Sequence, residues 1–298
     1  MYEGSQRVTN QQLFLGIDGG GTKCKARLED AHGNLLGEGL AGPANPVRGL
    51  AQTIESIVSA TEHALVEAQI DKSQICNINA GLGLAGVNLP SFFQKIHQWQ
   101  HPFANMSLTT DLHIACLGAH NGQDGAVIIT GTGFSAGSLI GEKHLEIGGH
   151  GFVLGDSGSG AKLGASSIRR ALEVLDGITP SSSFVEAILK QLDCSNSVSV
   201  VEKTINAQPA FYAQFAPLVL EFANQGDVIA EEQVNIAADY ISRIARRLLA
   251  DNPPRLSMIG GISGPISKWL AEDIRAQLSA PLQPPEVGAI LLARQQSS

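Results

Sequence analysis

Residues 13–29 read LFLGIDGGGTKCKARLE, and this stretch decides the fold. The apolar run that ends at Asp18 predicts a buried strand. Three glycines follow, and they can reverse the chain because glycine reaches positive φ without steric cost. The alternating residues after Lys23 predict a second strand that returns beside the first. We therefore expect a β-hairpin with a glycine-rich turn.

This turn is a candidate phosphate site. Gly20, Gly21 and Thr22 would present backbone N–H groups in a concave row, which is a typical anion site. Lys23 adds a cation, and Asp18 adds a carboxylate that could hold Mg²⁺ through water. An ordinary hairpin turn that binds nothing is the alternative. The turn lacks the Walker pattern and no helix follows it, which argues against a P-loop and a dinucleotide-binding turn.

Composition narrows the class of protein. The chain has 298 residues, enough for one large or two ordinary domains, and its net charge of −8 argues against nucleic acid as a partner. No run of eighteen apolar residues occurs, so we expect no membrane span. The polar N-terminus does not resemble a signal peptide, which favours a cytoplasmic location. Four widely spaced cysteines without a C-x-x-C pair predict buried free thiols and no zinc or iron–sulfur site.

Strands and helices alternate along the first part of the chain. The expected strands are residues 13–18, 23–29, 35–40 and 108–110, with helices over 50–69 and from 112, and an apolar run over 75–84. A second strand, Gly/Thr turn and strand follow at 126–129, 130–133 and 134–140, which is an internal repeat of architecture. Further on we expect helical structure over 166–251, a strand over 256–259, and helices over 265–278 and 285–295.

Three glycine turns, each directly after an apolar strand, favour a nucleotide site. Two of them would hold phosphates, and the third, at Gly260 and Gly261, would let an adenosine lie against bare backbone. Tight turns of an ordinary α/β sheet remain the alternative explanation.

Five motifs in this order carry a resemblance to a known family: DGGGTK (18–23), TTD (109–111), GTG (131–133), GDSGSG (155–160) and IGGI (259–262). The chain resembles sugar kinases of the actin/hexokinase/Hsp70 superfamily. Within that superfamily it is similar to the N-acetylglucosamine kinase and bacterial glucosamine kinase group of the BadF/BadG/BcrA/BcrD ATPase family. The resemblance covers about residues 13–293.

The resemblance implies an α/β fold with two ribonuclease-H-like (actin-like ATPase) domains around a nucleotide cleft. We expect the first domain over residues 1–112 and the second over 113–285, with a C-terminal helix at 286–298 that packs back on the first. The resemblance implies that ATP and Mg²⁺ are cofactors. The residues it assigns to them are Asp18, Gly20, Gly21, Thr22, Lys23, Thr132, Gly133, Gly260 and Gly261, with Asp18 nearest to Mg²⁺.

Asp111 is the predicted catalytic residue. It follows a short strand, so it would project from the carboxyl end of a sheet, where α/β proteins place ligands. Phosphoryl transfer to a hydroxyl needs a carboxylate that accepts the proton. The alternative is that Asp111 merely caps the helix that follows.

The resemblance also implies a sugar site made by Asn45, Asp111, Gly133, Ser135 and Asp156. Asn45 precedes a proline and Asp156 lies among glycines, so each could instead be an ordinary turn residue. The chain departs from the family in two places. Ser157 stands where many relatives have Glu, and Phe134 stands where a small polar residue is common.

The expected activity is transfer of phosphate from ATP to the 6-hydroxyl of N-acetylglucosamine, a small-molecule amino sugar. Glucosamine is the alternative substrate. An ATPase that activates a CoA dehydratase is less favoured, because the chain lacks the paired cysteines that hold its iron–sulfur cluster. A non-catalytic sugar sensor is also less favoured, because it would need no base. A homodimer stays open, since relatives are often dimers.

Overall fold

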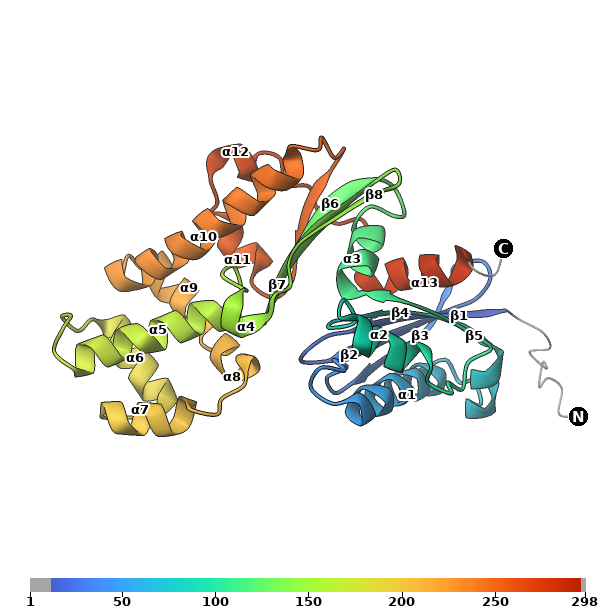
Figure 1. The fold of residues 1–298 in the computed structure, drawn as a ribbon, viewed down its shortest axis with the longest axis horizontal. Coiled ribbons are helices and arrows are strands. Elements are labelled where there is room, and N and C mark those ends of the chain that lie inside the picture. The colour runs from blue at the N-terminus through green and yellow to red at the C-terminus, as the bar shows by residue number, and fades with distance from the viewer. Residues whose placement is uncertain (1–11, 296–298) are drawn as a thin grey trace, which may run out of the picture. The chain divides into compact units, whose positions relative to one another are not determined.

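The computed structural model describes residues 12–295, which form two compact units (Figure 1). The first unit comprises residues 12–122 together with 282–295, and the second is Gln123–Pro281. The first boundary therefore follows helix α3 (Asp111–Ala119), whereas the sequence placed it at 112. Helix α3 stays with the first unit because it packs against α13 (Pro285–Gln295) and the first sheet.

The first unit is built on a mixed sheet with strand order β3-β2-β1-β4-β5. Strands β1 to β3 form an antiparallel meander, and β4 and β5 run parallel to β1. The hairpin at the glycine turn is therefore confirmed. The strands are β1 (Leu13–Gly19), β2 (Cys24–Glu29), β3 (Leu35–Ala41), β4 (Ile78–Leu84) and β5 (Asn105–Thr110).

Helices cover both faces of this sheet (Figure 1). Helix α1 (Leu50–Glu67) packs on β2 and β3, and α13 packs on the opposite face of β1 and β4. A Cβ on Gly16 would lie 1.9 Å from the Glu286 carbonyl oxygen, and one on Gly81 would lie 1.9 Å from that of Ala289. Helix α13 therefore touches the strands backbone to backbone. The first unit is completed by η1 (Lys72–Asn77) and α2 (Pro90–His97).

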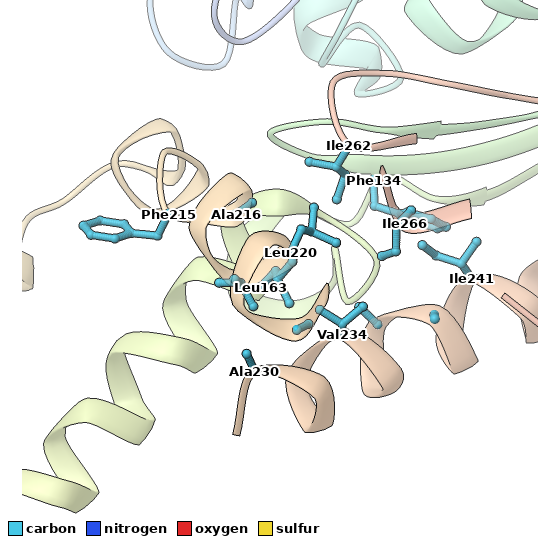
Figure 2. Packing of buried hydrophobic residues seen from close by; sticks show 14 of the residues in the cluster. Phe134, Leu163, Phe215, Ala216, Leu220, Ala230, Val234, Ile241, Ile262 and Ile266 are labelled. Carbon is cyan, nitrogen blue, oxygen red and sulfur yellow. The ribbon is translucent and has the colours of Figure 1, made fainter. Parts of the chain in front are cut away.

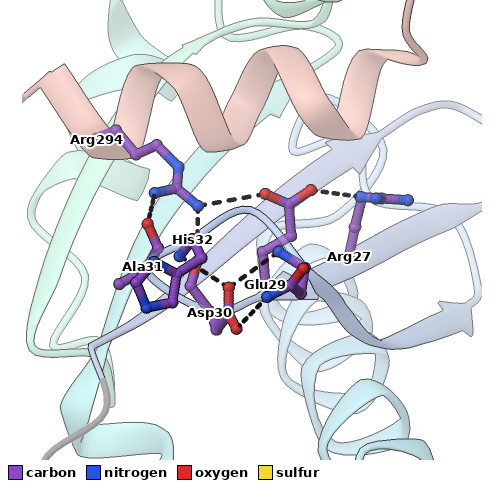
Figure 3. A network of polar contacts seen from close by, with 7 residues as sticks. Arg27, Glu29, Asp30, Ala31, His32 and Arg294 are labelled. Carbon is purple, nitrogen blue, oxygen red and sulfur yellow. Dashed lines mark hydrogen bonds and ion pairs between the residues drawn. The ribbon is translucent and has the colours of Figure 1, made fainter.

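The C-terminal end of α13 is fastened to the β2–β3 turn by Arg294 (Figure 3). The Arg294 guanidinium donates to the carbonyl oxygens of Asp30 (2.8 Å) and Ala31 (3.0 Å) and pairs with the Glu29 carboxylate (3.3 Å). It also lies over the Phe14 ring, 4.2 Å from its centroid. Charge-assisted hydrogen bonds of this kind are stronger than neutral ones, so they hold the helix in one position along the sheet.

The second unit repeats the topology of the first. Its sheet has the order β8-β7-β6-β9, in which β6 to β8 form an antiparallel meander and β9 runs parallel to β6. The order matches β3-β2-β1-β4 of the first unit, so the predicted internal repeat is confirmed. The strands are β6 (Gly125–Thr130), β7 (Phe134–Ile140), β8 (Lys143–Gly148) and β9 (Leu256–Ile259). The sequence did not predict β8, because this edge strand has no buried residue and carries few apolar ones.

Most of the second unit is helical, as predicted, and packs into one core (Figure 2). Phe134 and Ile262, which follow the second and third glycine turns, both contribute to this core with Leu220 and Ile241. The helices before β9 are α4 (Gly151–Leu154), α5 (Gly160–Leu175), α6 (Ser183–Leu192), α7 (Ser197–Thr204), α8 (Pro209–Ala213), α9 (Ala216–Asn224) and α10 (Val228–Leu249).

The single helix predicted over 265–278 is wrong. The structure has two short helices there, α11 (Ser263–Ser267) and α12 (Glu272–Arg275). The Ala271 backbone N–H donates to the Ser242 hydroxyl of α10 (3.1 Å), so it is not available for a continuous helical ladder. A tertiary hydrogen bond has overridden the local helical periodicity at this point.

Two expectations from composition can be compared with the described residues. No helix within residues 12–295 combines the length and apolarity needed to cross a membrane. The four cysteines carry free thiols, as predicted, but only Cys24 and Cys116 are buried; Cys76 is exposed and Cys194 is half-buried. Burial and the nearby charge of Asp18 raise the pKa of the Cys24 thiol to about 12, which makes it unreactive.

The packing of α13 predicts that Gly81→Ala will destabilise the first unit. The new methyl group would overlap the Ala289 carbonyl, and overpacking of this kind costs about 2–3 kcal/mol. Gly42→Ala is the control, because its Cβ would meet only the Ser56 hydroxyl at an ordinary 3.5 Å. Urea unfolding measures both variants, and equal free energies of unfolding would contradict the close contact of α13 with the sheet.

Candidate active site

Asp18 lies at the carboxyl end of β1, on the face that carries α13. It stands two residues after Gly16, so the two share a face of the sheet. In the sheet register Asp18 is opposite Lys25 on β2 and Gly83 on β4. A Cβ on Gly83 would overlap the Ile114 side chain of α3. Helix α3 therefore packs on β4 next to the position of Asp18.

The first glycine turn has the geometry of a tight, exposed loop. The Gly20 N–H donates to the Lys23 carbonyl (2.9 Å), and the Gly20 carbonyl accepts from the Ala44 N–H (2.9 Å). The Arg48 guanidinium donates to the Gly21 carbonyl at 2.9 Å. Thr22 and Lys23 are exposed at the tip. The turn therefore has two cationic side chains beside it, which suits an anionic ligand.

The carboxyl group of Asp18 has an unusual proton affinity. Burial, followed by the negative charges of Glu286 and Asp111, raises the pKa of Asp18 to about 7, although Lys25 and Lys23 act in the opposite direction. Burial disfavours a charged carboxylate, and neighbouring carboxylates disfavour it further. Asp18 and Asp111 are thus close enough to interact, so the structure brings together two of the predicted site residues.

The charges around Asp18 fit a divalent cation. Three carboxylates, those of Asp18, Asp111 and Glu286, interact there, and a cation would relieve their repulsion. Within the described part of the chain no three His, Cys, Asp or Glu side chains converge as direct metal ligands. Mg²⁺ does not need such a cluster, because it commonly keeps several waters and takes one or two carboxylates together with phosphate oxygens.

Asp111 is the first residue of α3. Thr110 performs the capping function, because its hydroxyl accepts from the His113 N–H at 3.2 Å. Asp111 Oδ1 accepts from the adjacent Leu112 N–H, at 2.9 Å. Asp111 directly follows β5, so it stands at the carboxyl end of this strand, in the same row of strand ends as Asp18.

Asn45 belongs to the loop beside the first glycine turn. Its Oδ1 accepts from the Val47 N–H (3.0 Å), which is the turn geometry that Asn before Pro favours. A Cβ on Gly86 would lie 2.6 Å from this oxygen, so the residues after β4 press against the Asn45 side chain. Asn45 is thus positioned near the turn, but its carbonyl oxygen already serves the local backbone.

In the second unit, Thr130 at the end of β6 contacts the predicted loops. These loops are the second glycine turn at 131–133, the loop at 155–160 and the third glycine turn after β9. Its buried hydroxyl donates to the Gly158 carbonyl (2.6 Å), and its own carbonyl accepts from the Ile262 N–H (3.3 Å). The Gly160 N–H donates to the Gly131 carbonyl at 2.7 Å. A Cβ on Gly260, where φ is +109°, would lie 2.2 Å from the Thr130 carbonyl oxygen. Only glycine fits this approach.

Asp156 lies beside the second glycine turn. A Cβ on Gly133 would be 3.5 Å from Asp156 Oδ2. Asp156 is buried and has φ of +63°, a left-handed conformation that Asp tolerates better than most residues. Burial raises the pKa of its carboxyl group, while a hydrogen bond from the Phe134 backbone and the charges of Lys162 and His150 oppose the shift. A buried carboxylate in a strained loop is typical of functional sites.

Thr132 directly precedes Gly133 in this turn, and Ser135 is the second residue of β7. Gly261 is so open that a Cβ there would meet no atom within 4 Å. The predicted residues therefore form two groups, one in each unit.

Sequence reasoning missed three charged residues beside the predicted ones. They are Arg48 next to Gly21, Lys162 near Asp156, and Glu286 near Asp18. No local pattern marks them, because each reaches its neighbour only through the fold.

Comparison with known proteins identifies the family of the chain. Residues 15–293 match the model of the BadF/BadG/BcrA/BcrD ATPase family. The chain belongs to this family. The matched segment includes all the glycine turns and both Asp18 and Asp111.

Proteins similar to the chain include amino-sugar kinases. The chain is 32% identical to glucosamine kinase GspK of Vibrio cholerae, over 94% of this chain and 95% of that protein. It is 26% identical to the N-acetyl-D-glucosamine kinase of Dictyostelium discoideum, over 95% and 98%. The solved structure of a candidate N-acetylglucosamine kinase from Chromobacterium violaceum superposes with a TM-score of 0.90 at 31% identity, covering 95% and 99% of the two chains. The predicted two-domain actin-like fold is confirmed.

The raised pKa of Asp18 predicts that Asp18→Asn will stabilise this family member in the absence of nucleotide and metal. Between its ordinary pKa of 3.8 and about 7, the folded protein keeps a proton that the unfolded chain releases. The contribution of Asp18 to stability therefore falls as pH rises through this window. We expect Asp18→Asn to gain on the order of 2 kcal/mol at pH 8 and little at pH 4.

Asp71→Asn is the control for this measurement. The exposed Asp71 carboxylate accepts hydrogen bonds from Ser73, which lower its pKa, so its pH dependence should have the opposite sign. Urea unfolding at pH 4 and pH 8 measures both variants. An Asp18→Asn effect that is the same at the two pH values would contradict the raised pKa.

Proposed function

We propose that the protein is an ATP-dependent amino-sugar kinase that phosphorylates the 6-hydroxyl of N-acetylglucosamine. The observation that carries the proposal is the interaction of Asp18 and Asp111 at the strand ends beside the first glycine turn. In this proposal the Asp18 carboxylate lies beside the metal ion and the phosphates, and the Asp111 carboxylate is close enough to interact with Asp18. The family match and the kinase relatives support the use of ATP.

In this proposal, backbone N–H groups and side chains of the first turn bind phosphate. Gly20, Gly21, Thr22 and Lys23 supply them, as do Thr132 and Gly133 in the second unit. Arg48 adds a positive charge beside Gly21. Asp18 would hold Mg²⁺ through water, and the ion would neutralise charge on the phosphates when bound. Gly260 and Gly261 leave bare backbone for the adenosine.

Asp111 acts as the base. Its carboxylate accepts the proton of the sugar's 6-hydroxyl and orients the oxygen for attack, which is the usual contribution of an aspartate in phosphoryl transfer. Its place at the start of α3, next to Asp18, suits this chemistry because the acceptor oxygen must approach the bound phosphates.

The relatives support the acetylated sugar. Over nearly its whole length the chain is similar to an N-acetyl-D-glucosamine kinase and to the solved structure of a candidate N-acetylglucosamine kinase. In this proposal the buried Asp156 carboxylate, beside Gly133, accepts hydrogen bonds from sugar hydroxyls.

Glucosamine is the second candidate substrate. The specific observation in its favour is the 32% identity to glucosamine kinase GspK over almost the whole of both chains. The two sugars differ in charge and size only at the 2-position, so a direct comparison of their kinetics decides between them.

The activity is tested by an ADP-release assay with Mg²⁺ and four sugars: N-acetylglucosamine, glucosamine, glucose and N-acetylmannosamine. We expect N-acetylglucosamine to have the highest kcat/KM, with product phosphorylated at the 6-position by NMR. Higher kcat/KM for glucosamine would establish the second candidate instead. Failure of all four sugars to raise ADP release would refute the kinase proposal.

Replacement of the proposed base should slow turnover strongly while leaving the fold intact. We expect Asp111→Asn to lower kcat by roughly 10²–10⁴, the usual contribution of a general base. The matched control is Asp71→Asn, because Asp71 also starts a helical turn and accepts from a backbone N–H, that of Ser73. Near-normal kcat in Asp111→Asn would eliminate Asp111 as the base.

Asp156→Asn tests the sugar site. Asn also tolerates the left-handed conformation, so the loop should keep its shape while the carboxylate charge is lost. Hydrogen bonds to a charged group are stronger than neutral ones, and we expect KM for the sugar to rise about tenfold. KM for ATP should stay the same. A change in KM for ATP, with no change in KM for the sugar, would show that Asp156 does not bind the sugar.

A further inference from the structure

Glu286 is a buried carboxylate that the predicted site residues do not include. It lies in the first turn of α13 and is only 6% exposed. Its Oε1 pairs with the Lys25 ammonium at 2.9 Å. Within the described residues no hydrogen-bond donor reaches its Oε2, although this oxygen is shielded from solvent. A buried carboxylate oxygen without a donor is rare in folded proteins and calls for a ligand or water to satisfy it.

The backbone contact of α13 places Glu286 beside Asp18. The Glu286 carbonyl rests against Gly16, two residues before Asp18 on the same face of β1. Lys25, the ion-pair partner of Glu286, is opposite Asp18 in the register of β1 and β2. Glu286, Lys25 and Asp18 therefore meet on one face of the sheet, at the end where the first glycine turn begins.

The balance of charge at this place is negative. Asp18 interacts with the carboxylates of Glu286 and Asp111, and Glu286 affects it more strongly than Asp111 does. The Lys25 ammonium pairs with Oε1 of Glu286. Oε2 of Glu286 has no hydrogen-bond donor among the described residues. A hydrated divalent cation would supply what is missing, namely positive charge and water O–H groups that donate to carboxylate oxygens.

We propose that Glu286 is a second carboxylate of the divalent-cation site at Asp18, with Oε2 accepting a hydrogen bond from a water bound to the ion. This inference rests on the proposed function only in taking Asp18 as the nearest carboxylate to Mg²⁺. Lys25 holds the Glu286 side chain in place through Oε1. The C-terminal helix thereby contributes directly to a site that otherwise belongs to β1 and α3.

A purely structural explanation exists for the same contacts. The ion pair of Lys25 and Glu286 would then serve only to tie α13 to β2. In that case removal of either partner would have the same consequence, a loss of stability without a specific effect on metal binding. The two explanations differ in whether the Glu286 charge matters once Lys25 has been removed.

The experiment measures Mn²⁺ binding to the full chain in the presence of ADP, by electron paramagnetic resonance of the free ion. The variants are Glu286→Gln, Lys25→Met and the double variant that combines them. We expect Glu286→Gln and the double variant to bind Mn²⁺ 10- to 100-fold more weakly, the usual effect of losing an outer-shell partner. Lys25→Met should stay within about threefold of the parent, because it keeps the carboxylate.

The double variant guards against misfolding of Glu286→Gln. It removes both members of the ion pair, of which only Glu286 is buried, and so leaves no uncompensated charge. Parental Mn²⁺ affinity in the double variant would overturn the proposal, as would an equal loss in Lys25→Met. The outcome of the sugar screen does not depend on the outcome of the Mn²⁺ measurement. Weakened Mn²⁺ binding in the variants, without sugar turnover by the parent, would support the role of Glu286 and reject the kinase proposal. Sugar turnover by the parent, with parental Mn²⁺ affinity in the double variant, would support the kinase proposal and reject the role of Glu286.

Discussion

The contact of α13 with the backbone of β1 and β4 is the constraint on which the first unit depends. Gly16 and Gly81 allow the helix to approach until its carbonyl oxygens touch the strands. This approach buries the face of the sheet that bears Asp18, and it brings Glu286 to the same place. The packing and the electrostatics of the site therefore have one cause, since the residues that close the core also set the charge around Asp18.

The second unit reaches a similar arrangement by a different means. Its loops are not covered by a helix that returns from elsewhere in the chain. Instead, the buried hydroxyl and carbonyl of Thr130 fasten the loops that hold Gly158 and Ile262, and Phe134 and Ile262 anchor these loops in the core (Figure 2). The two sheets share a strand order, yet one relies on helix packing and the other on hydrogen bonds between loops.

Much of the fold and part of the site could be predicted from the sequence, because local patterns carry them. Apolar strands followed by glycine turns located β1, β6 and β9, and the strand before Asp111 placed its side chain at a strand end. Glu286 and Arg48 carried no such signal, since their neighbours lie far away in sequence. The edge strand β8 lacked an apolar pattern, and the Ser242 hydroxyl interrupted a helix whose periodicity alone would have continued. Tertiary contacts decided each of these cases.

The return of the chain to the first sheet has a consequence for the order of folding during synthesis. Residues 282–295 leave the ribosome only after all of Gln123–Pro281 has been made. Until then β1 and β4 expose the glycine-lined groove that α13 will fill, whereas the second unit already has its whole core. The first unit therefore keeps an uncovered apolar surface until α13 has been synthesised. The second unit can complete its packing before the first unit does.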